Sequence, residues 1–486
     1  MAFDTIPAQI GVPGHYVEFD KSQAQPRLLT QPKRALIIGQ RLTVGTVAAG
    51  VPTRITRKET AWAAFGYGSM LAEMCEYWLR QTEAVELWAV ALNDNGAGQA
   101  AVGTITMTGP ATAAGTLQLY VAGKKISVGV AKAATAAQIA TAIAAAITAD
   151  PKLPITAAVA GGTPTVVDIT ARHKGEVGNS IDVRANYNQG DRLPAGVGIA
   201  IVCPTGGTTN PAVTAALTAI GAVQYTTIVH PYIDATNLAA LEAEAALRWD
   251  GLHANDGHLI SAVPGTHADG STLGDSRNAP HSTIMGVQKS PTWAPILAAQ
   301  VAAADAAEPD PARPRQSLVL RDVLPPSVAD RYIWSERNLH LGDGIATYTV
   351  DDGGLCRIER LVTTYKVNEQ GIPDVSYRDI ERMRSLSYIR FMVRARLSQV
   401  FPRHKLADDG GDYDPLQAIA TPSIIKAELV ALFRDLVRAA IVENIEQFIQ
   451  DIRVVRNTED SDRVDILLPP DLVNQLRVTA TSIQFR

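Results

Sequence analysis

The chain has 486 residues, which at about 150 residues per domain corresponds to about three domains and gives ample length for an apolar core. Its 44 Lys and Arg residues against 49 Asp and Glu residues give a formal charge of -5, and 46% of its residues are hydrophobic. This balance argues against a nucleic-acid binder, a polybasic membrane protein and a disordered chain, which need excess charge or few apolar residues.

The cysteines and the first residues bear on the compartment. Cys75, Cys203 and Cys356 are far apart and odd in number, so neither a disulfide framework nor the paired spacing of a zinc site is present. The first residues carry no basic segment ahead of an apolar run, and no apolar run reaches the roughly 18 residues that span a bilayer. We therefore expect the chain to fold in a reducing cytoplasm without membrane insertion.

The first thirty residues are predicted to form an extended arm with one strand at 14–19, because prolines interrupt them and no helical period is present. Beyond the arm, short apolar runs alternate with helical segments, which predicts a doubly wound α/β core with a mainly parallel sheet. Helices are expected to begin at Ser69, at Asn210 followed by Pro211, and at Thr236. The predicted core strands are 35–39, 86–92, 225–229, 258–263 and 283–287.

The composition changes between residues 93 and 208, where the sequence is rich in Gly, Ala, Thr and Val and contains none of the eight Phe or six Trp residues. We interpret this stretch as an inserted β-rich domain, which an exposed connection tolerates because loop closure costs grow only slowly with length. Its helix is expected to begin at a capping box of Thr135 and Gln138 and to end at Asp150. Its predicted strands are 104–107, 116–121, 125–130, 165–170 and 180–183.

The C-terminal part is predicted to be α+β. A hairpin is expected at 345–362, and helices are expected at 377–398 and after Thr421 and Pro422. The last three predicted strands are 452–456, 464–468 and 476–485, and in the last the apolar residues switch from even to odd positions, which suggests a bulge or two environments. The expected domains are an arm at 1–30, a core at 31–92 and 209–370, the insertion at 93–208, and a C-terminal domain with a terminal strand at 371–486.

Known catalytic and cofactor motifs are absent from the sequence, which has no P-loop, complete dinucleotide fingerprint, zinc-protease motif or nucleophile elbow. One loop, residues 274–282, does contain Asp275, Ser276 and His281, as if for acyl transfer. It enters a predicted strand at the amino end, the wrong edge for catalysis, so we favour a structural loop in which Arg277 and Asn278 bond backbone groups. We expect no catalytic residue, cofactor or metal, and interpret the nearby histidines as structural: His253, His258 and His267.

A basic segment lies between residues 375 and 405. It contains eight Lys or Arg residues and only two acidic residues, Asp379 and Glu381, which gives a local charge of +6 in an acidic chain. Two interpretations stay open. The segment is either a solvated helix face paired with acids elsewhere, or a contact surface for an acidic partner.

Five long segments, in the same order, carry a resemblance that extends over nearly the whole chain. The five segments are Val-Pro-Gly-x-Tyr-x-Glu at 12–18 in the arm, Leu-Gly-Asp-Ser-Arg-Asn-Ala-Pro-His at 273–281, Trp-Ser-Glu-Arg-Asn-Leu at 334–339, Pro-Arg-His-Lys-Leu-Ala-Asp-Asp-Gly at 402–410, and Leu-Leu-Pro-Pro-Asp-Leu-Val-Asn-Gln-Leu-Arg-Val at 467–478 with the closing Ile-Gln-Phe-Arg at 483–486. In these segments the chain resembles the tail sheath proteins of contractile phages, particularly the Mu-like branch.

The resemblance implies a non-enzymatic structural subunit with a subtilisin-like core, which polymerises helically around a tail tube in the virion and contracts. Its partners would be further copies, the tube protein, and the baseplate and tail terminator proteins. The insertion would face outward and the C-terminal domain would face the tube. A sheath from an R-type bacteriocin or a type VI secretion-like apparatus is the alternative, and an α/β serine hydrolase is less favoured.

The same resemblance suggests three sets of contact residues. The expected inter-subunit arm is Val12, Pro13, Gly14, Tyr16 and Glu18. The expected inter-subunit strand is Leu476, Arg477, Val478, Ile483 and Phe485, and the candidate tube contact is Arg382, Arg390 and Arg394. Both chain ends suit strand addition to a neighbour's sheet.

Overall fold

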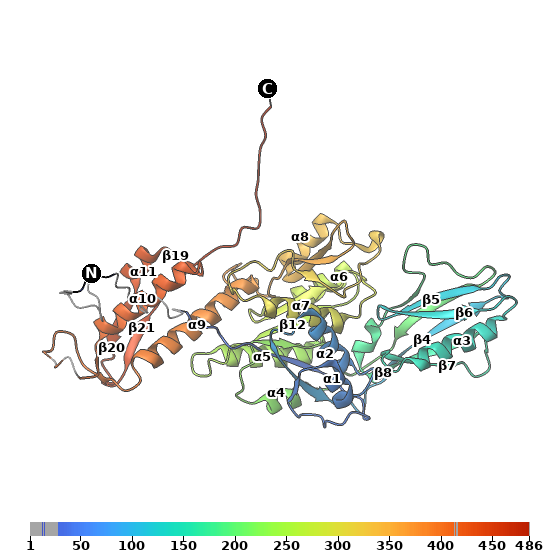
Figure 1. The fold of residues 1–486 in the computed structure, drawn as a ribbon, viewed down its shortest axis with the longest axis horizontal. Helices are drawn as coiled ribbons and strands as arrows, with labels where there is room; N and C mark the ends of the chain where they lie inside the picture. Colours follow the sequence, from blue (N-terminus) through green and yellow to red (C-terminus); the bar gives the residue numbers. More distant parts are fainter. Residues whose placement is uncertain (1–11, 13, 15–27, 413, 415–416, 486) are drawn as a thin grey trace. The chain divides into compact units, whose positions relative to one another are not determined.

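The computed structural model describes residues 12, 14, 28–412, 414 and 417–485 (Figure 1). The chain divides into two compact units. The smaller unit consists of Met1–Pro32 and Ser385–Asn474, and the larger unit consists of Lys33–Arg384 and Gln475–Arg486. Among the described residues, no helix is both long and apolar enough to cross a membrane.

A nine-stranded mixed sheet forms the centre of the larger unit, in the order β14-β16-β15-β13-β12-β11-β1-β3-β2. The pairings from β3 through β1, β11, β12 and β13 to β15 are parallel, while β2, β16 and β14 add antiparallel edges. The class prediction of an α/β fold is therefore confirmed. The strands are β1 (Arg34–Gln40), β2 (Thr53–Ile55), β3 (Glu86–Leu92), β11 (Thr227–Val229), β12 (His258–Val263), β13 (Ser282–Gly286), β14 (Val319–Leu320), β15 (Ile345–Val350) and β16 (Cys356–Arg360).

The strands at the centre of this sheet are buried on both faces because helices cover them. Two of these helices, α2 and α7, pack against each other and on the central strands. Ser69 accepts a hydrogen bond from the N–H of Ala72 and so caps α2, as predicted. The helices are α1 (Lys58–Phe65), α2 (Met70–Gln81), α4 (Thr214–Ile220), α5 (Ala235–Trp249), α6 (His267–Asp275), α7 (Ala294–Ala307) and α8 (Trp334–Asp343), with a 3₁₀ turn at Val328–Asp330.

Two predicted helix starts were wrong. Asn210 does not cap α4, because its side chain donates to Asp234 Oδ2 at 2.8 Å and accepts from the N–H of Glu176 at 2.8 Å. The helix begins at Thr214 instead. Likewise α5 is capped by Asp234, which accepts from the N–H of Asn237, and not by Thr236.

Residues 93–208 form two sheets of their own, in the orders β10-β4-β8-β7 and β6-β5-β9. The capping box of Thr135 and Gln138 begins α3, whose Ile139, Ile143 and Ile147 are buried, as predicted. The predicted strand at 180–183 was wrong, because a 3₁₀ turn occupies Glu176–Ser180 and β9 begins after it. The elements are β4 (Ala100–Thr108), β5 (Gly115–Val121), β6 (Lys124–Val130), α3 (Ala136–Ala149), β7 (Ile155–Val159), β8 (Val166–Lys174), β9 (Val183–Ala185) and β10 (Gly198–Thr205).

Buried polar contacts fix these two sheets to the rest of the larger unit. Lys124 at the start of β6 lies 2.7 Å from the Glu73 carboxylate of α2, whose side chain is almost fully buried. Burial raises the pKa of Glu73, although Lys124 opposes that shift. In addition, the indole N–H of Trp293 donates to Ser180 Oγ at 2.9 Å. Residues 93–208 therefore belong to the larger unit, which is one compact body.

The smaller unit packs two long helices over short two-stranded sheets. Thr421 caps α10 with Pro422 at its first position, as predicted, and Ile425, Leu429 and Leu432 are buried. The elements are α9 (Ile380–Val400), which starts in the larger unit, β17 (Lys405–Leu406), β18 (Ile419–Ala420), α10 (Pro422–Arg438), β19 (Val442–Glu443), α11 (Ile445–Asp451), β20 (Arg453–Arg456), β21 (Val464–Leu467) and β22 (Asp471–Leu472). Their pairings are β17 with β18, β19 with β22, and β20 with β21.

Candidate functional site

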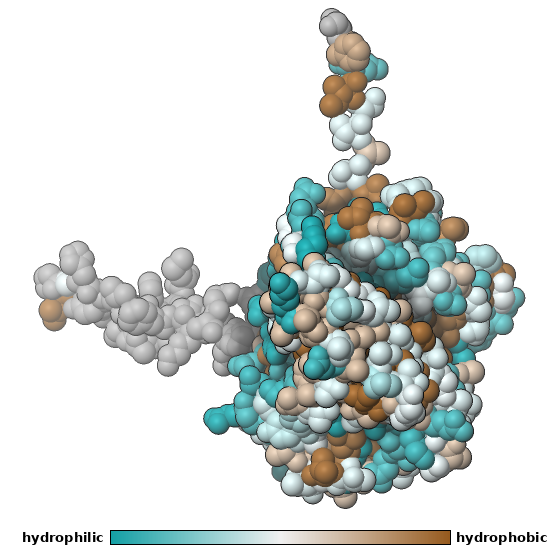
Figure 2. All heavy atoms as spheres, turned by 90° about the vertical axis from the view of Figure 1, so that its right-hand side faces the viewer, coloured by the Kyte–Doolittle hydropathy of each residue, from teal (hydrophilic) through white to brown (hydrophobic). Residues whose placement is uncertain are grey.

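The C-terminal tail, residues 478–485, is extended and solvent-exposed. Residues 473–485 have no secondary structure, and every side chain from Val478 to Phe485 is exposed. Figure 2 shows the tail as a narrow column of atoms rising clear of the larger unit, with apolar residues near its end. Val478 is 84% exposed and Phe485 is 94% exposed. The predicted strand at 476–485 is therefore not formed within this chain, because a strand needs a partner for its backbone groups.

Directly before this tail, Arg477 anchors the chain to the larger unit. Its Nη2 lies 2.8 Å from Glu381 Oε2 and 3.3 Å from Asp379 Oδ1, both in the first residues of α9 or just before it. The Glu381 side chain is fully buried, and its other oxygen accepts from the N–H of Arg315 at 2.9 Å. The exposed tail therefore begins directly after the anchored Arg477.

A second buried ion cluster holds the start of α9 to α7. Asp305, fully buried near the end of α7, lies 2.9 Å from Arg315 and 2.5 Å from Arg384 of α9. The two guanidinium groups outweigh the effect of burial and hold the pKa of Asp305 well below its usual value. Lys33 donates to the carbonyls of Ala306 and Glu308, and burial followed by the nearby Arg384 lowers the pKa of Lys33 to about 8.

Sequence reasoning missed both clusters, although one signal was available. Asp305 is the only charged residue in α7, and a lone carboxylate in an otherwise apolar helix indicates a buried partner.

The N-terminal arm lies largely outside the described residues. Pro13, Tyr16 and Glu18 are not described, while Val12 and Gly14 are exposed. The last residues of the expected arm, Leu28 and Leu29, pack on the apolar core of the smaller unit. The carbonyl of Leu29 accepts a hydrogen bond from Tyr388 Oη at 2.9 Å.

The hairpin of β20 and β21 presents both edges of a two-stranded sheet. Each strand pairs only with the other among the residues that the structure describes. β20 packs on α10, while Val455 and Leu467 are exposed. A lone two-stranded sheet is marginally stable and leaves a row of backbone groups for another strand.

Two arginines of the basic segment fit the first interpretation, a helix face paired with acids, while the tube contact proposed for the others is untested. Arg384 pairs with buried Asp305, and Arg396 lies 2.6 Å from Glu428. These two residues fit a helix face paired with acids elsewhere. Arg390 and Arg394 lie on α9 within the smaller unit, and Arg382 donates to the carbonyl of Val375 at 3.2 Å. Their role in a tube contact stays a prediction.

The Asp-Ser-His loop has the hydrogen bonds of a structural element. Ser276 Oγ donates to the carbonyl of Leu273 at 2.7 Å, and Asp275 lies 3.2 Å from Lys366. Asn278 bonds the backbone of residues 366 and 367, as predicted. The prediction for the Arg277 side chain was wrong, because its guanidinium group forms an ion pair with the Glu242 carboxylate.

The three histidines of interest occupy different environments. His253 is exposed beside Asp250, His258 is buried with its Nε2 2.8 Å from Thr283 Oγ1, and His267 stacks on His340 at 4.0 Å between ring centroids. Burial lowers the pKa of His258 well below its usual value, with Arg384 as the second cause. The described part of the chain contains no group of three or more His, Cys, Asp or Glu placed to hold a metal ion.

Comparison with known proteins identifies the class. The family model of the phage tail sheath protein central domain matches residues 206–364, and that of the phage tail sheath C-terminal domain matches residues 373–486. This chain therefore belongs to the phage tail sheath protein family.

The Mu-like assignment is also confirmed. The chain is 40% identical over 489 aligned residues to the Mu-like prophage FluMu tail sheath protein of Haemophilus influenzae, covering 100% of this chain and 99% of that protein. Two solved structures share the fold. The sheath tail protein of Desulfitobacterium hafniense is 14% identical with a TM-score of 0.50, covering 95% of this chain and 97% of that chain. The sheath tail protein Lin1278 of Listeria innocua is 15% identical with a TM-score of 0.51, covering 92% and 93%.

Proposed function

We propose that this tail sheath protein is a non-enzymatic subunit that polymerises helically around a tail tube and contracts to drive the tube through the host envelope. The observation that carries this proposal is the tail at 478–485, extended and exposed directly after the anchored Arg477. The ion pair of Arg477 with Glu381 fixes the start of the tail. The backbone of the tail can therefore complete the sheet of a neighbouring subunit.

The β20–β21 hairpin is the acceptor that fits such a tail best. Its outer edges, which pair with no other described strand, offer main-chain hydrogen bonds, and its exposed Val455 and Leu467 offer apolar contact. Each of Val478, Ile483 and Phe485 contributes about 1.5–3 kcal/mol when fully buried, before association costs. The N-terminal arm, including Val12 and Gly14, would add a further strand. Because these segments are tethers, subunits stay linked while their compact units slide.

The remaining roles follow from this arrangement. Residues 93–208 form the outward-facing domain, and 371–486 form the tube-facing domain, with Arg382, Arg390 and Arg394 toward the tube. The core has subtilisin-like architecture without a working triad. The other partners are the baseplate and tail terminator proteins, and assembly takes place in the host cytoplasm before the protein resides in the virion tail.

Electron microscopy of the purified protein tests the proposal. The full chain should form hollow striated cylinders, and deletion of residues 478–486 should leave a folded chain that forms none. A matched control, Val202→Ser, removes an exposed apolar side chain from β10 and should assemble normally. Normal cylinders from the truncated chain would reject the role of the tail. An R-type bacteriocin or type VI secretion-like sheath is distinguished by its neighbouring genes, and labelling of Ser276 by a fluorophosphonate would instead favour a hydrolase.

A further inference from the structure

The charged side chains of helix α8 form contacts within the larger unit, to which the helix belongs. Arg337 donates to the carbonyl of Tyr332 at 2.6 Å and forms an ion pair with Glu359. Asp343 accepts from Ser271 Oγ at 2.6 Å. The remaining ionisable side chains of the helix are also engaged, since Glu336 accepts from the N–H of Ile333 and His340 is buried.

The opposite face of α8 is exposed and uncharged. It carries Trp334, which is 72% exposed, and Leu339, with the adjacent Ile333 also exposed. Spacings of three and four residues place the exposed side chains on one face, completed by Ser335, Asn338 and Gly342. A solvated helix normally presents charge outward and apolar groups inward. The reversal, with an exposed Trp at the first position of the helix, is typical of a protein–protein interface, where aromatic residues are enriched.

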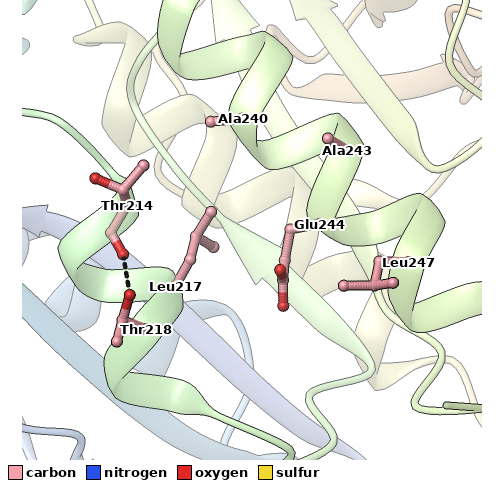
Figure 3. Close-up of a pocket in the computed structure, with 7 residues that line it drawn as sticks. All are labelled: Thr214, Leu217, Thr218, Ala240, Ala243, Glu244 and Leu247. Carbon is pink, nitrogen blue, oxygen red and sulfur yellow. Dashed lines mark hydrogen bonds between the residues drawn. The ribbon is translucent and has the colours of Figure 1, made fainter.

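A groove of complementary character lies between α4 and α5. Figure 3 shows Leu217 of α4 and Leu247 of α5 pointing into the space between the two helices. The hollow has a volume of about 390 Å³, and its other lining residues are Thr214, Thr218, Ala240, Ala243 and Glu244. Helix α4 contains no charged residue. Glu244 accepts from buried Arg248 at 2.7 Å, and a carboxylate has capacity for further donors such as an indole N–H.

Helix α8 and the groove lie at different places on the core of the larger unit, with α8 at the top and α4 at the bottom in Figure 1. Helix α8 packs on β15, whereas α5 packs on β12 and α4 packs on β3. The two helices of the groove therefore lie on strands that are two and five inter-strand steps from β15, or about 10 and about 24 Å at about 4.8 Å per step. A projection and a complementary hollow at different places on a subunit form a head-to-tail contact, which generates open polymers or rings and not a two-fold dimer.

We propose that Trp334 of one subunit docks into the α4–α5 groove of a second copy of this chain. The indole covers the apolar walls formed by Leu217 and Leu247 and donates its N–H to Glu244. This contact joins the larger units directly, in addition to the tail and arm. It rests on the proposed function, because both require a homopolymer.

Cross-linking tests the docking with the full chain. Asn338→Cys on α8 and Ala243→Cys on α5 are purified separately, mixed, assembled and treated with a short bismaleimide. The mixture should give covalent dimers, while each variant alone and a mixture of Asn338→Cys with Val202→Cys should give only the background of wild-type chain. Cylinders without the specific dimer would overturn the docking and leave the proposed function standing. If wild-type chain forms no cylinders at any concentration, the proposed function fails and the docking with it.

A second measurement uses the concentration at which assembly begins. Trp334→Ala should raise this critical concentration at least about tenfold, because a central aromatic side chain is a typical interface hot spot. Trp334→Phe should have a smaller effect, since it retains the apolar ring and loses only the donor. The matched control Val202→Ser should leave the concentration unchanged. An unchanged critical concentration for Trp334→Ala in a folded chain would also overturn the docking.

Discussion

Arg477 and Glu381 lie 96 positions apart in sequence, yet their side chains form an ion pair of 2.8 Å in which the carboxylate is fully buried. The chain therefore leaves the larger unit at a fixed point, because the last anchored residue is bound to the first turn of α9. Every described residue from Val478 to Phe485 is exposed. The direction in which the tail is offered to a neighbour depends on this pair.

A double-mutant cycle measures the anchor. Arg477→Met leaves the Glu381 carboxylate buried without its cation, so we expect a loss of about 3 kcal/mol in the free energy of unfolding. Glu381→Gln should cost a similar amount, and the double variant should cost less than the sum, with a coupling of about 1–3 kcal/mol. Urea unfolding followed by tryptophan fluorescence reports the change, since all six Trp residues lie in the larger unit.

The exposed pair of Lys289 and Asp330, which also lies in the larger unit, provides the control for this cycle. Its atoms are 3.4 Å apart and its side chains are 54% and 32% exposed, so its coupling should stay below about 1 kcal/mol. Strict additivity of the Arg477 and Glu381 variants would contradict the anchor.

Asp305→Asn should destabilise the larger unit more strongly. The amide has the shape of the carboxylate but leaves Arg315 and Arg384 facing each other without a compensating charge, so a cost of about 3–5 kcal/mol is expected. Asp275→Asn removes an exposed carboxylate from Lys366 and should cost under about 1 kcal/mol in the same urea experiment. Equal costs for the two variants would show that the Asp305 cluster adds nothing to stability.

The predicted tube contact is tested by charge reversal. Arg390→Glu combined with Arg394→Glu should weaken association with purified tail tube, and salt should weaken binding of the wild-type chain more than that of the variant. Circular dichroism and the urea midpoint serve as controls for folding. If the variant assembles on the tube with unchanged salt sensitivity, the segment is only a solvated helix face.

The sequence predicted the start of a helix correctly where the capping side chain bonds to the N–H groups of that same helix. Thr421 with Pro422 marks the start of α10, and Thr135 with Gln138 marks the start of α3, because these side chains satisfy the first N–H groups of their own helix. Asn210 failed for the opposite reason. Its amide is bonded to Asp234 and Glu176, which are distant in sequence, so the cap that the pattern predicted is not available.

The anchor could not be predicted by such patterns. Arg477, Glu381 and Arg315 come from three separate segments, and only the folded chain brings them together. The sequence predicted a strand at 476–485, because alternation of apolar residues can be recognised from neighbouring positions alone, but no strand forms there within this chain. Whether that strand pairs depends on a partner outside the chain.

The larger unit should lose stability as the pH falls from about 6.5 to about 4. His230 is fully buried, and burial lowers its pKa from 6.5 to about 4. The unfolded chain therefore binds a proton at a higher pH than the folded chain, so the stabilisation is present above pH 6.5 and is lost as the pH falls through this window. The difference corresponds to about 3 kcal/mol from His230 alone, and His258 and His340 shift in the same direction.

Urea midpoints of tryptophan fluorescence at pH 7.5, 6 and 4.5 check this dependence. Asp305 does not interfere in this range, because its lowered pKa means that its contribution is lost only below about pH 4. His230→Gln should flatten the profile between pH 6.5 and 4.5, whereas His253→Gln changes an exposed ring beside Asp250 and should leave the slope as in the wild-type chain. A wild-type midpoint that stays constant down to pH 4.5 would mean that the buried histidines do not destabilise the folded state on protonation.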